Sequence, residues 1–167
     1  MAKANKIAKL KIKASDLVAT ILKKINASSP DAESGTNGPL VTITKFYIIK
    51  NIGNNVTFSL VINTKGAGGL TDATLHKPNI SDKIILSGVK DSQLNIPVDK
   101  DTNLDVATLN VKTVVTSTNL TPVPVPLDVV FSMSGGQADE TFPIPARQFN
   151  KVGDVFILDF SITIFQS

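Results

Sequence analysis

Residues 153–165 read GDVFILDFSITIF, and the spacing of their apolar side chains decides the fold class. Successive side chains of a β-strand point to opposite faces, so an apolar residue at every second position predicts a strand with one unbroken apolar face. The residues on that face are Phe156, Leu158, Phe160, Ile162 and Ile164.

The same two-residue period recurs through the sequence after residue 39. Residues 40–50 and 55–64 are predicted to form a hairpin closed around Gly53, whose second strand has one apolar face made of Val56, Phe58, Leu60 and Ile62. Further strands are expected at 72–76, 83–87, 92–98, 104–116 and 126–133. The inward residues are expected to be Leu94, Ile96 and Val98 in the strand at 92–98, and Leu127, Val129, Phe131 and Met133 in the strand at 126–133.

These strands and the composition predict an all-β fold. About eight strands separated by turn signals are typical of an antiparallel β-sandwich, and the pattern leaves jelly-roll-like and immunoglobulin-like strand orders open. The alternation implies that each sheet buries one face, as antiparallel sheets do. The chain has 167 residues and no cysteine, so we expect one core held by packing without disulfides.

The N-terminus differs from the rest of the chain in its charge. Residues 1–24 contain seven of the seventeen basic residues and a single acid, Asp16. Residues 8–14, AKLKIKA, alternate as a strand does, with lysines on one side and Leu10 and Ile12 on the other, although a helical spacing through residue 25 also fits. The preferred interpretation is an extended basic arm followed by a short amphipathic helix over about 16–26.

A linker separates this arm from the strands. Residues 26–39 read NASSPDAESGTNGP and contain no large apolar side chain. We therefore predict an arm, helix and linker over 1–38 and a β-sandwich domain over 39–167.

Residues 121–127 read TPVPVPL, with Pro122, Pro124 and Pro126 at alternate positions. Proline cannot donate a hydrogen bond to a sheet, so this segment is not a central strand. It is expected to protect a sheet edge from unwanted pairing, or to be the place where a neighbouring subunit packs.

Catalytic and metal-binding residues are few. His76 is the only histidine and is expected to lie at the surface. Residues 99–105, DKDTNLD, begin like an EF-hand calcium loop, but Leu104 and Asn110 occupy the positions that require Gly and Glu, so an acidic turn is preferred. We expect no enzyme activity, no metal and no cofactor.

Lysines interrupt every apolar stretch near the N-terminus, so no signal peptide and no transmembrane segment are expected. The protein is expected to be made as a soluble cytoplasmic chain, with a virion or other particle as a destination.

The leading hypothesis is a structural subunit that self-associates as a homo-oligomer or within a larger assembly, such as a coat, tail or filament component of a virus or phage. The predicted partner-binding residues are Lys9, Leu10, Lys11, Ile12, Lys13, Pro122, Pro124 and Pro126. The arm could also neutralise nucleic-acid phosphates, but it lacks the arginine and aromatic residues that read or stack on bases.

Two alternative functions stay open. The first is a lectin-like, carbohydrate-binding module whose site would lie in loops 66–72, 88–92 or 134–140. The second, less favoured, is a membrane-active protein led by the amphipathic helix.

Overall fold

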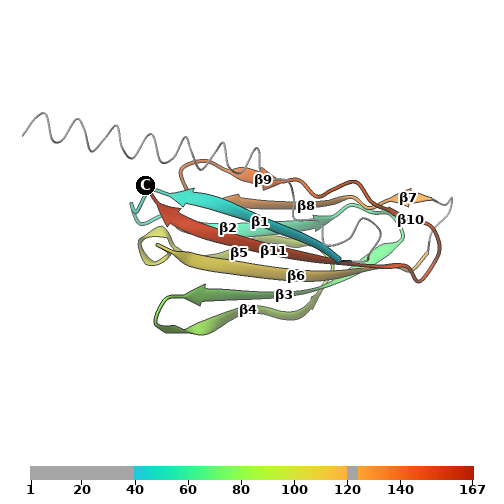
Figure 1. Ribbon diagram of the computed structural model, residues 1–167, viewed down its shortest axis with the longest axis horizontal. Helices are drawn as coiled ribbons and strands as arrows, with labels where there is room; N and C mark the ends of the chain where they lie inside the picture. The colour runs from blue at the N-terminus through green and yellow to red at the C-terminus, as the bar shows by residue number, and fades with distance from the viewer. Residues whose placement is uncertain (1–39, 120–123) are drawn as a thin grey trace, which may run out of the picture.

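The computed structural model describes residues 40–119 and 124–167, and within them the fold is all-β (Figure 1). One 3-10 turn, Asp101–Asn103, accompanies the strands. The strands are β1 (Leu40–Ile49), β2 (Asn55–Ile62), β3 (Ala67–Lys77), β4 (Ile80–Lys90), β5 (Gln93–Lys100), β6 (Ala107–Ser117), β7 (Val125–Pro126), β8 (Val129–Ser134), β9 (Glu140–Phe142), β10 (Gln148–Phe149) and β11 (Val155–Gln166).

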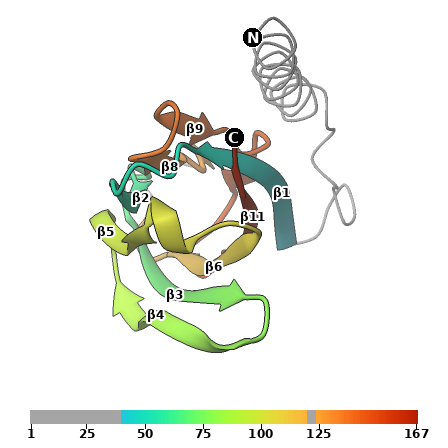
Figure 2. The same ribbon diagram turned by 90° about the vertical axis from the view of Figure 1, so that its left-hand side faces the viewer.

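The strands form two main sheets that pack against each other, as the end-on view in Figure 2 shows. The larger sheet has the order β1-β11-β6-β3-β4, and the smaller has the order β5-β2-β8-β9. A short ladder pairs β7 with β10 outside both sheets. The prediction of an all-β fold is confirmed.

Aromatic side chains from both sheets meet in the core. Phe131 of β8 stacks on Phe160 of β11, with ring centroids 4.5 Å apart. Phe58 and Phe142 each lie 5.8 Å from Phe131, within the smaller sheet. Because β8 and β11 belong to different sheets, this buried cluster joins the two layers.

The inward faces predicted for residues 153–165 and 126–133 are correct. From Leu158 to Ile164 the alternate apolar residues of β11 are buried, and Phe156 packs on the same core. The four residues predicted to point inward at 126–133 are also buried.

Two predictions about strand pairing are wrong. β1 and β2 do not form a hairpin, because β1 lies in the larger sheet and β2 in the smaller one. Gly53, at φ +88°, still makes the turn, but the chain crosses between the sheets there. The sheets are also not wholly antiparallel, since β1 pairs with β11 in parallel. Alternation shows which face is buried, but it does not identify the neighbouring strand.

Two predicted strands differ in their details. In β5, Leu94 is exposed while Val98 is buried, because Asn95 has a φ of +51° and the pairing with β2 shifts there. The strand predicted to begin at residue 104 begins at Ala107, after Val106, which has a φ of +57° and is 50% exposed. A backbone irregularity inside an alternating stretch changes which residues face the core.

The predicted arm, helix and linker lie outside the described residues. Within residues 40–119 and 124–167 no helix is long and apolar enough to span a membrane.

Candidate assembly surface

The outer face of the larger sheet carries a row of aliphatic side chains. The strand register places Leu40 opposite Ile157, Ile157 opposite Val114, and Val114 opposite Leu70. Their positions alternate with buried residues, so all four point away from the core. Leu70 is 44% exposed and the other three are partly exposed. We call this row the apolar stripe; it crosses four of the five strands.

A row of charged residues lies beside the apolar stripe. The next outward position on each strand lies two residues from the apolar stripe. There Asp159 of β11 is paired with Lys112 of β6, and Lys112 is paired with Asp72 of β3. Opposite charges on directly paired residues attract each other across a sheet. The apolar stripe is therefore bordered on this side by an acid–base–acid row.

Two of the four edge strands of the main sheets are irregular. The pairing of β4 with β3 shifts register at three places, and that of β5 with β2 shifts at two. β5 also contains Pro97, which has no backbone N–H. Bulges and prolines of this kind discourage an edge strand from pairing with another chain.

The other two edge strands are β9 and β1. β9 has three residues, whereas β1 has ten, and each of the ten is paired one-to-one with β11. Among the described edge strands, β1 is therefore the long and regular one.

Backbone hydrogen bonds show which groups of β1 point away from β11. The carbonyl of Ile49 accepts a hydrogen bond from the N–H of Ser167, which directly follows β11, while the carbonyl of Ile48 accepts one from Gln137 in the β8–β9 loop. Backbone groups alternate in direction along a strand, so those of Thr42 and Thr44 also point away from β11. Within the described residues, no hydrogen bond to these outward groups of Thr42 and Thr44 is formed.

The proline segment, of which residues 124–126 are described, shows how an edge is protected. The N–H of Leu127 donates to the carbonyl of Arg147 on the β10 side. Pro126 therefore points its backbone away from β10, and its carbonyl accepts a hydrogen bond from Thr64. Pro124 has the same orientation by alternation, and both prolines are exposed. Each proline occupies a position at which another residue would direct its backbone N–H away from β10, so neither can donate a hydrogen bond to an added strand. This is consistent with protection of that edge.

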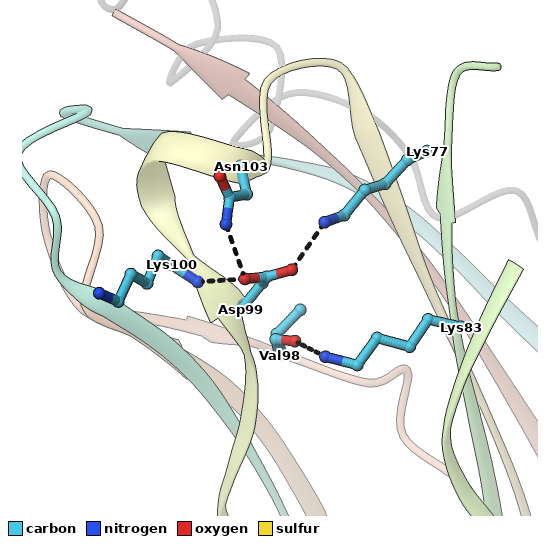
Figure 3. A network of polar contacts seen from close by, with 6 residues as sticks. All are labelled: Lys77, Lys83, Val98, Asp99, Lys100 and Asn103. Atoms are coloured by element: carbon cyan, nitrogen blue, oxygen red, sulfur yellow. Dashed lines mark hydrogen bonds and ion pairs between the residues drawn. The ribbon is translucent and has the colours of Figure 1, made fainter. Parts of the chain in front are cut away.

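Side chains bridge β5 and the end of the larger sheet that is formed by β3 and β4, away from β1 (Figure 3). Lys77 Nζ lies 2.6 Å from Asp99 Oδ2, and Lys83 Nζ donates to the carbonyl of Val98. Partial burial acts to raise the pKa of Asp99, but hydrogen bonds from Lys77, Asn103 and the Lys100 N–H outweigh it and lower the pKa to about 2. These contacts give the network a structural role.

The acidic turn after β5 uses its carboxylates internally. Asp101 accepts hydrogen bonds from the backbone N–H groups of Ile52 and Gly53, and Asp105 accepts one from Gln166. Burial acts to raise the pKa of Asp101, but the backbone donors around it lower the pKa below its ordinary value. The turn between β5 and β6 is thus tied to the β1–β2 loop and to the end of β11. No group of three or more potential metal-ligating side chains occurs in the described part of the chain.

The only histidine lies at the exposed end of the β3–β4 hairpin. His76 Nδ1 is 2.6 Å from Asp82 Oδ1, and both side chains are 57% exposed. The prediction of a surface histidine is confirmed.

The loops considered for carbohydrate binding differ from the prediction. Residues 67–72 belong to β3, and 88–90 belong to β4. The β8–β9 loop is a true loop, but it is fastened to β1 by the hydrogen bond from the Gly136 N–H to the Tyr47 hydroxyl. Tyr47 is fully buried, so it offers no ring on which a sugar could stack.

Of the predicted partner-binding residues, the structure describes Pro124 and Pro126. Lys9, Leu10, Lys11, Ile12, Lys13 and Pro122 lie outside the described residues, while Pro124 and Pro126 lie at one end of the fold beside β10 (Figure 1).

The apolar stripe was missed from the sequence. The sequence does indicate it in part, because two consecutive residues are apolar in three strands, so that both faces of the strand are apolar at that point. These pairs are Leu40–Val41, Val114–Val115 and Ile157–Leu158. Alternation identifies the buried member of each pair, but only the register shows that the outward members align.

Comparison of the chain with protein-family models, curated proteins and solved structures gives no significant match.

Proposed function

We propose that this protein is a non-enzymatic structural subunit that self-associates, of the kind that builds the coat, tail or filament of a virus or phage particle. The apolar stripe is the observation that carries the proposal. Contiguous apolar side chains on the outer face of a sheet are typical of surfaces covered by another protein. A polar row beside an apolar centre, as the acid–base–acid row is here, is also common at the rim of an interface.

The stripe can pair with itself. A two-fold axis that lies in the plane of contact, parallel to the sheet and running along the stripe, would stack the four aliphatic side chains of one copy on those of a second. Such a contact uses the same surface on both copies, so no other protein is needed. A second, different contact surface on each copy would extend the pair into a filament or a shell.

The finer architecture belongs to the same proposal. We propose a β-sandwich of the immunoglobulin-like type, because the order β11-β6-β3-β4 in the larger sheet corresponds to the strand order G-F-C-C′ of variable-type immunoglobulin domains. The pairing of β5 with β2 corresponds to strands E and B. Strands β8 and β9 occupy additional positions in the smaller sheet.

Substitution in the stripe tests the function. We expect L70K and V114K to shift full-length protein from oligomer to monomer, measured by light scattering over a concentration series and by negative-stain imaging. S132K is the matched control, because Ser132 lies on the outer face of the smaller sheet and is also partly exposed. Circular dichroism establishes that each variant is folded.

A protein that stays monomeric at all concentrations in its wild-type form would contradict the proposed function. Oligomers that persist in both lysine variants would exclude the stripe as the contact. Binding of the monomer to glycans on an array would favour the carbohydrate-binding alternative instead.

A further inference from the structure

The outward edge of β1 differs along its length: the carbonyl of Ile48 is already hydrogen-bonded to Gln137, whereas the first half of the strand offers outward backbone groups. The backbone groups of Thr42 and Thr44 point away from β11 and lack hydrogen-bond partners in the described part of the chain. The strand has no bulge in its pairing with β11 and contains no proline. Addition of a strand to such an edge supplies main-chain hydrogen bonds along its length.

The other edge strands are less suited to strand addition than β1. β4 and β5 have shifted registers, β9 is three residues long, and the outward positions of β7 include Pro126. Each of these features discourages strand addition. Strand addition is therefore best supported at β1.

The chain itself contains a segment suited to this edge. Residues 8–14 alternate between lysine and apolar side chains, so as a strand they would have one polar and one apolar side. The polar side would continue the outer face beside Thr42 and Thr44. The apolar side, with Leu10 and Ile12, would continue the inner face beside the buried residues of β1.

Charge and reach both favour this occupant. Asp159 is directly opposite Thr42 on the outer face, so a lysine one strand further out would lie within about 10 Å of its carboxylate. Twenty-five residues, 15–39, separate this segment from β1 in the sequence, and they span at most about 85 Å fully extended, or about 65 Å with the helix expected over 16–26. They are followed by Leu40, which is both the first residue of β1 and a member of the apolar stripe.

We propose that the edge of β1 at Thr42 and Thr44 accepts residues 8–14 of a neighbouring copy as an added strand. This inference rests on the proposed self-association, because a two-fold axis running along the apolar stripe places the Leu40 of each copy on the Leu40 of the other. The arm of one copy is then close to the β1 edge of its partner. Exchange of such arms strengthens a symmetric assembly by adding backbone hydrogen bonds.

Cysteine cross-linking tests the pairing directly, because the chain contains no cysteine. Full-length protein with K11C is mixed with differently tagged full-length protein with T44C and then oxidised. We expect a disulfide-linked species that carries both tags. K9C and K13C test neighbouring registers, and K151C, in the β10–β11 turn, replaces T44C as a control that should give no specific cross-link.

A chain carrying both K11C and T44C distinguishes exchange from folding back. A cross-link within one chain, without one between chains, would overturn the proposal, and so would the absence of any cross-link with all three arm cysteines.

A backbone variant provides an independent measurement. T44P removes an N–H that points away from β11, so it blocks strand addition while sparing the β1–β11 ladder, whereas T44V keeps the N–H. We expect T44P to raise the concentration of half-association by about tenfold or more and T44V to leave it near wild type. Wild-type assembly that T44P leaves unchanged would overturn the role of the arm but not the proposed function, which L70K tests separately.

Discussion

The hydroxyl of Tyr47 accepts a 2.8 Å hydrogen bond from the backbone N–H of Gly136, 89 residues away in the sequence. Beside it, the N–H of Gln137 donates to the carbonyl of Ile48 over 2.8 Å. Tyr47 and Ile48 belong to β1 in the larger sheet, and the loop containing Gly136 follows β8 in the smaller one. These two bonds therefore fasten the sheets together on the side where β1 forms the edge.

Ionisation of Tyr47 should destabilise the fold at high pH. Burial raises the pKa of Tyr47 to about 12, aided by Asp139 and Glu140 and opposed by the hydrogen bond from Gly136. Tyrosine in the unfolded chain has a pKa near 10, so between pH 10 and 12 the unfolded state binds fewer protons than the native state. Stability falls with rising pH in that window, by about 2 to 3 kcal/mol in total.

Because Tyr47 is the only tyrosine and tryptophan is absent, the near-ultraviolet absorbance of tyrosinate measures this pKa directly. The Y47F variant should lose about 1 to 2 kcal/mol at neutral pH, since it leaves a buried N–H without its partner. It should also lack the tyrosine contribution to the alkaline decline. A native-state pKa near 10 would contradict the prediction.

Gly136 should not tolerate a side chain. A Cβ at this position would lie 2.5 Å from the carbonyl oxygen of Ile48 and 2.7 Å from the ring of Tyr47. We expect G136A to lower the free energy of unfolding by about 1 to 3 kcal/mol in denaturant titrations. In the control G68A, a new Cβ would come no closer than 3.8 Å to Asp91 and should change stability by under about 0.5 kcal/mol. Equal effects of the two variants would exclude this steric explanation.

The sequence predicts the inward faces of this fold better than its strand pairing. The alternation at Phe160 and Phe131 identifies core residues, because each strand in the two-layer fold buries one face. The parallel neighbour of β1 is more than a hundred residues away, and no local pattern encodes it. The reversed prediction at Leu94 has a local cause, since the left-handed conformation of Asn95 is required by the bulge and not by the residue type.

The ion pair of Asp99 should stabilise the protein only above acidic pH. The pKa of Asp99 is about 2 in the native state and 3.8 without its partners. A lowered carboxyl pKa contributes stability that is complete above the unfolded value and is lost as pH falls through the native value. We expect stability to decline between pH 4 and pH 2 by about 2 kcal/mol more in the wild type than in D99N, measured by chemical denaturation at each pH.

Two lysine variants separate the donors of Asp99. K77M removes the ammonium that lies 2.6 Å from the carboxylate, whereas K100M keeps the backbone N–H that Lys100 donates. The Lys100 side chain points away from Asp99 in Figure 3. A carboxyl-carbon NMR titration should therefore show a higher Asp99 pKa in K77M and little change in K100M. If both variants shift the Asp99 pKa equally, the net positive charge nearby determines that pKa, and the direct contact with Lys77 does not.

The candidate surface could be predicted less well than the core. The outward residues Val114 and Ile157 resemble other exposed aliphatic residues until the register brings them together. The edge at Thr44, which lacks a partner among the described residues, has no compositional signal either, because what distinguishes it is the regularity of β1 compared with the irregular edge strands β4 and β5. Both features depend on the arrangement of distant strands.

A buried pair of threonines provides the last prediction. Thr71 and Thr113 are directly paired on β3 and β6, their hydroxyl oxygens are 2.9 Å apart, and both residues are fully buried. T71V or T113V alone leaves one hydroxyl without a partner inside the core, so each should lose about 1 to 3 kcal/mol of stability.

The double variant should be close to wild type, because valine has the shape of threonine and neither hydroxyl then remains unpaired. We therefore expect a coupling energy of about 1 to 2 kcal/mol from a double-mutant cycle in denaturant. The matched control is the pair Thr108 and Thr163, which is directly paired on the outer face, where water can satisfy both hydroxyls. Coupling there should be near zero, and equal coupling in the two cycles would mean that the buried hydrogen bond is not its cause.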